Sequence, residues 1–235
     1  MKKKEEAIIL VHGAGVGGWI YKELADLLRK EGYDVYTPTF TGLGERVHLL
    51  NKNINLDTHI NDIINCINYN GIQNVVLLGH SYGGILVSAI VDRISEKIKK
   101  QIYLDSYFFE NNTTIMDLLG EEKSKEMLSY VENEGEGWYL PRRLFGKPHP
   151  LILDMPVAPY LEKVTITGAR NNVPGFFIDC TIDKYFEHIR APKERAKKIC
   201  RELNWPIFLL ESNHSPMTKP VEREALFKIL LEILE

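Results

Sequence analysis

The stretch Val75-Val76-Leu77-Leu78-Gly79-His80-Ser81-Tyr82-Gly83 decides the fold. Its apolar run predicts a buried strand, and the small residues that follow, 84–91, predict a helix. Between them stands a G-x-S-x-G pattern, which in this setting is a nucleophile elbow. Side chains at positions 79 and 83 would collide with the neighbouring strand and helix, so both positions require glycine. Ser81 is therefore the predicted nucleophile of an acyl-transfer site, with its hydroxyl near the first N–H groups of the helix.

Further strands and helices alternate on both sides of the elbow. Apolar runs predict strands over 7–12, 33–37, 74–78, 100–105, 173–180 and 205–210. Helical periodicity predicts helices over 19–30, 57–70, 191–203 and 221–235, with Asp57 as the N-cap of the second. This alternation is typical of an α/β protein with a doubly wound, mostly parallel sheet.

The periodic pattern breaks in the middle of the chain. Residues from about 108 to 172 contain helical fragments, at 115–119 and 121–131, between proline-rich loops. The length of 235 residues fits one domain. We therefore expect a single α/β domain over 1–235, with an inserted cap at about 108–172.

Composition narrows the class of protein and the compartment. The chain is 44% hydrophobic and 26% charged with a formal net charge of −3, which gives no sign of a nucleic-acid partner. We find no apolar run near the roughly 20 residues of a membrane span, and a strand expected from Ala7 leaves no room for a signal peptide. The three cysteines lack metal or redox spacing. We expect a cytoplasmic protein that needs no metal or cofactor, acts on a small molecule and is compatible with a homodimer.

The general base is expected at the carboxyl end of the last strand, where open α/β sheets bind ligands. His214 lies there, in the polar turn 211–216 before the terminal helix. His12 and His80 are expected to brace loops. The remaining histidines are expected on loop or helix surfaces: His48, His59, His149 and His188.

The acid that orients the base should follow a strand before His214 in the chain. Asp183 lies just beyond the strand expected at 173–180 and is the favoured candidate. Asp179 would serve if that strand ends early, and Asp105, after the preceding strand, is the third alternative.

The remaining parts of the site come from two loops and the cap. The backbone N–H of Tyr82, directly after the nucleophile, and that of Ala14, in the glycine-rich loop after the first strand, are the predicted oxyanion donors. Apolar cap residues are expected to line the substrate pocket and to favour small hydrophobic or aromatic esters. They are Phe108, Trp138, Tyr139, Leu140, Phe145 and Met155.

With these motifs assembled, the chain resembles the α/β-hydrolase superfamily, and within it the branch of plant methyl esterases, hydroxynitrile lyases and bacterial esterase-like proteins. The resemblance is carried by LVHGAGVGGWIYKELADLL, YTPTFTGLGERVHLL, VVLLGHSYGG and IYLDSYFF, and it covers nearly the whole chain. It implies that Asp183, in Thr181-Ile182-Asp183-Lys184-Tyr185-Phe186, is the acid. Hydroxynitrile lyases carry a threonine and a lysine where this chain has Gly13 and Ser215.

These departures favour a serine hydrolase that cleaves carboxylic esters over a carbon–carbon lyase. A non-catalytic small-molecule receptor on the same fold is the other alternative. An ester-hydrolysis assay distinguishes the serine hydrolase from the lyase and from the receptor.

Overall fold

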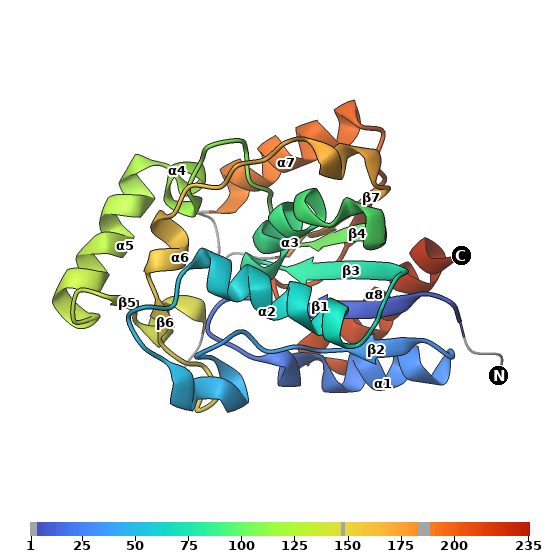
Figure 1. Cartoon of the computed structure of the whole chain (residues 1–235), viewed down its shortest axis with the longest axis horizontal. Coiled ribbons are helices and arrows are strands. Elements are labelled where there is room, and N and C mark those ends of the chain that lie inside the picture. Colours follow the sequence, from blue (N-terminus) through green and yellow to red (C-terminus); the bar gives the residue numbers. More distant parts are fainter. Residues whose placement is uncertain (1–3, 147–148, 183–188) are drawn as a thin grey trace.

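Six parallel strands form the central sheet of the computed structural model, which describes residues 4–146, 149–182 and 189–235 (Figure 1). The strands lie in the order β2-β1-β3-β4-β7-β8. Their bounds are β1 Ala7–Val11, β2 Asp34–Tyr36, β3 Val75–His80, β4 Ile98–Leu104, β7 Gly175–Cys180 and β8 Ile207–Leu210. The doubly wound α/β architecture is thus confirmed.

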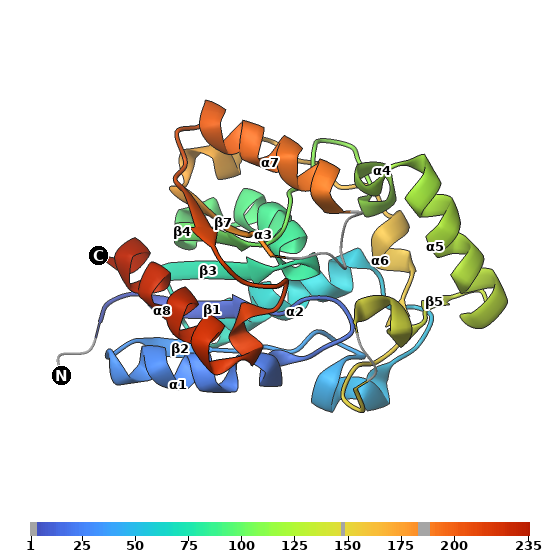
Figure 2. The same cartoon turned by 180° about the vertical axis from the view of Figure 1, so that it is seen from behind.

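Helices cover both faces of this sheet. The helices α1 (Lys22–Lys30) and α8 (Pro220–Leu234) lie on one face, and α2 (Leu56–Tyr69), α3 (Tyr82–Arg93) and α7 (Arg190–Glu202) lie on the other (Figures 1 and 2). Along β1, Ile8 and Leu10 pack toward α1 and α8, whereas Ile9 and Val11 pack toward α2 and α3. Both faces of each central strand are buried, which explains why these strands read as continuous apolar runs.

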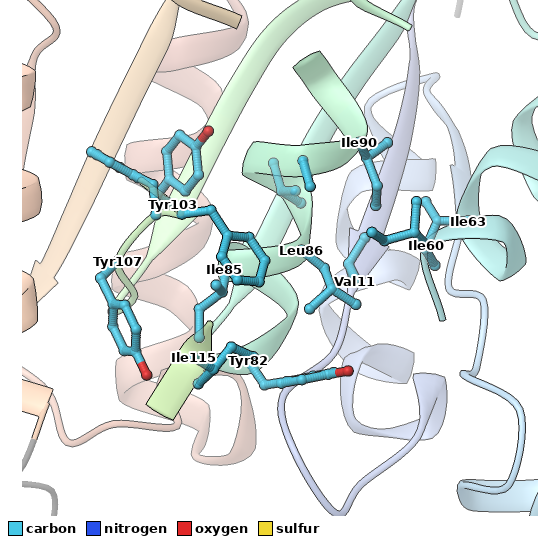
Figure 3. Close-up of a cluster of buried hydrophobic side chains, with 14 of the residues drawn as sticks. Val11, Ile60, Ile63, Tyr82, Ile85, Leu86, Ile90, Tyr103, Tyr107 and Ile115 are labelled. Carbon is cyan, nitrogen blue, oxygen red and sulfur yellow. The ribbon is translucent and has the colours of Figure 1, made fainter. Parts of the chain in front are cut away.

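Side chains of α3 fill the core between α2 and the end of β4. Figure 3 shows Ile85, Leu86 and Ile90 of α3 between Ile60 and Ile63 on one side and the tyrosines at 103 and 107 on the other. The helix is buried almost all round, so it holds the elbow at its N-terminus rigidly against the sheet.

The expected N-cap of α2 is wrong by two residues. Asn55, not Asp57, caps the helix, because its side chain accepts a hydrogen bond from the Thr58 N–H at 2.8 Å while the Thr58 hydroxyl lies 3.3 Å from the Asn55 N–H. This reciprocal pair satisfies two N–H groups that would lack partners. Asp57 lies in the first turn and pairs with Arg93 of α3.

The segment between β4 and β7 lies beside the sheet, at the end away from the chain termini (Figures 1 and 2). It contains α4 (Ile115–Leu119), α5 (Glu121–Glu134), α6 (Ala158–Leu161) and an antiparallel pair, β5 (Tyr139–Leu140) with β6 (Met155–Pro156). The remaining short elements are 3-10 helices: η1 Gly18–Tyr21, η2 Gly44–Leu49, η3 Ser95–Lys97, η4 Arg142–Phe145, η5 Ala169–Asn172 and η7 Pro216–Thr218. Among the described residues, no helix combines the length and apolar character that a bilayer crossing requires.

Candidate active site

The turn between β3 and α3 holds Ser81 in a strained conformation. Its backbone has φ +53° and ψ −124°, which few residues other than glycine adopt. The Ser81 N–H donates to the carbonyl of Leu104 at 3.1 Å. The Ser81 carbonyl accepts from the hydroxyl of Ser106 at 2.5 Å. These contacts to β4 and the residues after it fix the elbow from outside its own segment.

The glycines of the elbow are required by close packing, as expected. A Cβ at Gly79 would lie 2.6 Å from the Gly83 carbonyl oxygen, and one at Gly83 would lie 2.4 Å from the carbonyl oxygen of His12. Neither backbone atom can move away cheaply. The helix can therefore begin directly above β1 and β3 only with these glycines.

His214 contacts a carboxylate through its inner ring nitrogen. Its Nδ1 lies 2.6 Å from Oδ2 of Asp105, the third of the candidates from sequence. Asp105 follows β4 with φ +46°, and its Oδ1 accepts from the Cys180 N–H at 3.1 Å and pairs with Lys193. The favoured candidate, Asp183, lies outside the described residues. Asp179 pairs with two lysines of α7, Lys193 and Lys197.

Asp105 is ionised throughout the range in which the protein would work. Burial opposes ionisation, but the hydrogen bond and charge of His214 and the nearby ammonium of Lys193 outweigh it and lower the pKa of Asp105 to about 2. An ionised carboxylate on Nδ1 fixes the imidazole in the tautomer whose Nε2 can accept a proton.

His80, inside the elbow, braces the loop of His214 as expected. Its Nε2 donates to the carbonyl of His214 at 2.6 Å, and the two rings lie 4.6 Å apart. Its Nδ1 is buried with no hydrogen-bond partner among the described residues. Burial, aided by the neighbouring His214, lowers the pKa of His80 to about 3. The ring is therefore neutral and positions the His214 backbone without competing for the proton.

His12 braces the loop that carries one predicted oxyanion donor. The Phe40 N–H donates to Nε2 of His12 at 3.1 Å, so Nδ1 carries the proton and donates to the Gly13 carbonyl at 2.8 Å. Burial lowers the pKa of His12 to about 3, which keeps this tautomer neutral. The ring thus ties the loop of Ala14 to the segment after β2.

The expectation that His59 lies on a surface is wrong. It is fully buried on the inner face of α2, because its ring replaces an apolar side chain in the helical repeat. Its Nε2 donates to the Thr41 carbonyl at 3.1 Å, and its Nδ1 accepts from the Tyr82 hydroxyl at 2.8 Å. His59 therefore anchors the residue whose N–H is the other predicted oxyanion donor. His48 and His149 are exposed as expected, and His188 lies outside the described residues.

A cavity of about 100 Å³ opens beside Ser81. Its wall includes His214 and both predicted oxyanion residues, Ala14 and Tyr82. Among the described residues, the rest of the wall is mostly apolar and carries a single cation, Lys123: Gly13, Val16, Ile20, His80, Ile85, Tyr107, Leu119, Lys123, Met127, Leu144, Phe145, Tyr160, Ile189 and Ser215. Gly15 lies against the ring of Phe145, since a Cβ there would come within 2.6 Å of it.

Of the six predicted pocket residues, the wall that the described residues form includes only Phe145. Phe108 instead packs in the core against Tyr103 and Trp205. Leu140 and Met155 are fully buried where β5 pairs with β6. Trp138 and Tyr139 pack on each other, half-buried beside the same pair. Phe108 thus belongs to the core beside the sheet. The other four side chains pack around the β5–β6 pair, because apolar residues in a short insertion are needed first for its own packing.

Several residues of the site escape sequence reasoning. Tyr107, Tyr160 and the α5 residue Met127 line the cavity, yet each resembles an ordinary core residue in sequence. Ser106 lies in the stretch IYLDSYFF, which by itself gives it no role, and Lys193 stands in no motif. Asp105 does carry a signal, because it comes directly after a strand, and this makes it one of the three candidates for the acid.

Comparison with known proteins identifies the family of the chain. A sequence model of the alpha/beta hydrolase family matches residues 8–225. The chain is 47% identical over 111 residues to a carbendazim-hydrolysing esterase of Nocardioides sp. (strain SG-4G), an alignment that covers 47% of this chain and 46% of that enzyme. A chloroplastic protein of Arabidopsis thaliana that carries the name methylesterase 14 is 28% identical over 254 residues, 97% of this chain and 71% of its own.

The fold also matches solved structures. An extracellular α/β-hydrolase from a Paenibacillus species, described as homologous to tobacco salicylic acid binding protein 2, superposes with a TM-score of 0.81 at 18% identity. The match covers 96% of this chain and 98% of that one. With the elbow, the parallel sheet and the family match over 8–225, the chain belongs to the α/β-hydrolase family, in a branch that resembles the plant methylesterases.

Proposed function

We propose that this serine ester hydrolase cleaves carboxylic esters of small hydrophobic or aromatic compounds through an acyl-enzyme on Ser81. The observation that carries the proposal is that Ser81, in its strained turn, shares one cavity with a histidine whose Nδ1 is held by a buried carboxylate. The names of the relatives, an esterase and a methylesterase, support ester cleavage.

In the first step, Nε2 of His214 takes the proton of the Ser81 hydroxyl as its oxygen attacks the ester carbonyl. Asp105 stays ionised and stabilises the imidazolium that forms. The carbonyl oxygen becomes an oxyanion that accepts hydrogen bonds from the N–H groups of Ala14 and Tyr82. His214 then gives its proton to the leaving alcohol. In the second step His214 activates a water, which releases the acid and frees Ser81.

The cavity supports small, uncharged substrates. Its volume of about 100 Å³ is of the order of an engineered cavity of about 150 Å³ that accepts benzene. Its apolar side chains come from η4 and α5 on the cap side and from η1 and α3 on the sheet side. The acyl or alcohol part of the ester would fill this space with little room for a charged group.

The experiment is labelling with a fluorophosphonate, followed by a panel of p-nitrophenyl esters. Intact-protein mass spectrometry should find one adduct in the wild-type protein and none in the Ser81→Ala variant. The variant should lose several orders of magnitude in kcat, because the residues of such a site act as a unit. Its fold should persist, since only one hydroxyl is removed. Labelling of Ser81→Ala, or charged esters as the best substrates, would contradict the proposal.

A further inference from the structure

We propose that Lys193 is a positioning residue of the active site, whose ammonium holds the carboxylate that orients His214. The inference rests on the proposed function, in which Asp105 is the acid. Lys193 lies on α7, outside every segment that carries the motifs of the fold.

The two oxygens of Asp105 serve different partners. Oδ2 contacts Nδ1 of His214 at 2.6 Å, while Oδ1 pairs with the ammonium of Lys193 and accepts from the Cys180 N–H. A carboxylate held at both oxygens cannot rotate about its last bond without losing a charged contact. Lys193 therefore fixes the direction in which Oδ2 meets the imidazole.

The contact is buried, so its charge is weakly screened. The side chains of Lys193 and Asp105 are 12% and 1% exposed. Burial alone would lower the pKa of the Lys193 ammonium, but Asp105 and Asp179 together raise it above its ordinary value. The ammonium thus remains charged at every pH at which the enzyme would be assayed.

A fixed positive charge beside Asp105 has a definite effect on the neighbouring imidazole. The Asp105 carboxylate stabilises the imidazolium that forms at His214 during the reaction, and the ammonium opposes part of that attraction. Removing the ammonium leaves the carboxylate unopposed, which favours the imidazolium in the variant. Because the neutral imidazole is the general base, the acid limb of the kcat/KM profile should move to higher pH.

Other charged groups face this cluster and provide a matched control. Asp179 of β7 accepts from Lys193 at 2.7 Å and from Lys197 at 2.6 Å, and Lys197 also pairs with Glu194. Neutral His80 lies beside His214, with the two rings 4.6 Å apart. Lys197 is as buried as Lys193, at 13% exposed, and ties α7 to β7 in the same way, but its charged partners among the described residues are Asp179 and Glu194. A role in packing alone would be shared by both lysines.

The test compares Lys193→Gln with Lys197→Gln by the pH dependence of kcat/KM on a p-nitrophenyl ester. Lys193→Gln should move the acid limb upward by about 1 pH unit and lower kcat about tenfold. Lys197→Gln should leave the limb in place, and Lys193→Arg should restore it. An unmoved limb in Lys193→Gln, or an equal movement in Lys197→Gln, would overturn the inference.

A second measurement needs no turnover. In the Ser81→Ala background, the ¹³Cε1 signal of His214 reports protonation of the ring as the pH changes. Lys193→Gln should shift this titration upward and Lys197→Gln should not. If the wild-type protein fails to hydrolyse esters while this shift is observed, the proposed function fails and the role of Lys193 stands. If esters are hydrolysed and the titration does not shift, the proposed function stands and the role of Lys193 fails.

Discussion

Replacing Asp105 by asparagine should disable the enzyme by inverting the hydrogen bond to His214. Oδ1 of Asp105 faces two donors, the ammonium of Lys193 and the N–H of Cys180, so the amide oxygen of the variant would occupy that position. Its NH₂ group would then face Nδ1 of His214, which must become an acceptor. The proton would move to Nε2, and that nitrogen could no longer take the proton of Ser81.

The loss for such a change of tautomer is about 10⁴ in kcat. That corresponds to about 5.5 kcal/mol of transition-state stabilisation. The assay is kcat on a p-nitrophenyl ester for Asp105→Asn, with Asp179→Asn and Asp183→Asn as comparisons. We expect Asp179→Asn to cost much less, because its contacts are to α7 lysines.

The comparison with Asp183→Asn decides between the structure and the resemblance. If Asp183→Asn is the crippling change and Asp105→Asn keeps more than about a tenth of wild-type kcat, the reasoning from the His214–Asp105 contact is refuted. Near-UV circular dichroism should confirm that each variant folds. A folded Asp105→Asn protein without activity is the expected result.

Two further predictions concern the elbow and the cavity. Gly83→Ala should lower stability by about 1–3 kcal/mol and reduce fluorophosphonate labelling, because its Cβ would lie 2.4 Å from the His12 carbonyl; thermal melts measure the first effect. Gly71→Ala is the control, because a Cβ at Gly71 would meet only open space although its φ is +66°. It should lower stability by only about 1–2 kcal/mol and leave labelling intact. Equal labelling of the two variants would contradict the argument. Phe145→Ala should raise KM and change the ranking of esters, whereas Trp138→Ala, which lies off the cavity wall, should leave KM unchanged. A raised KM in Trp138→Ala with an unchanged KM in Phe145→Ala would indicate that Trp138, and not Phe145, contacts the substrate.

The elbow and the sheet could be predicted because their signals are local. Gly79, Ser81 and Gly83 are adjacent to the strand and the helix that they join, and the glycines exclude other residues by direct contact. The continuous apolar strands reflect burial on both faces, which is a property of each strand by itself. His214 could be located because a parallel sheet places the carboxyl ends of its strands at one edge.

The apolar residues of the cap could not be assigned to the core or to the pocket from sequence. Phe108, Leu140 and Phe145 are all apolar residues in a segment without regular periodicity. Only packing separates the two that build the core from the one that faces the cavity. Hydrophobicity alone predicts that a side chain is removed from water, and both a core and a substrate pocket remove it from water.

By itself, the sequence determined the parallel α/β fold, the nucleophile elbow and the strand after which a histidine base should stand. Each follows from contacts between neighbours in the chain or from the burial of one strand. Only the tertiary structure decided which carboxylate meets His214 in the described chain, and that a lysine of α7 holds it. Asp105 and Lys193 are 88 residues apart, and their contact depends on how β4 and α7 pack, which no local pattern of charge or hydrophobicity encodes.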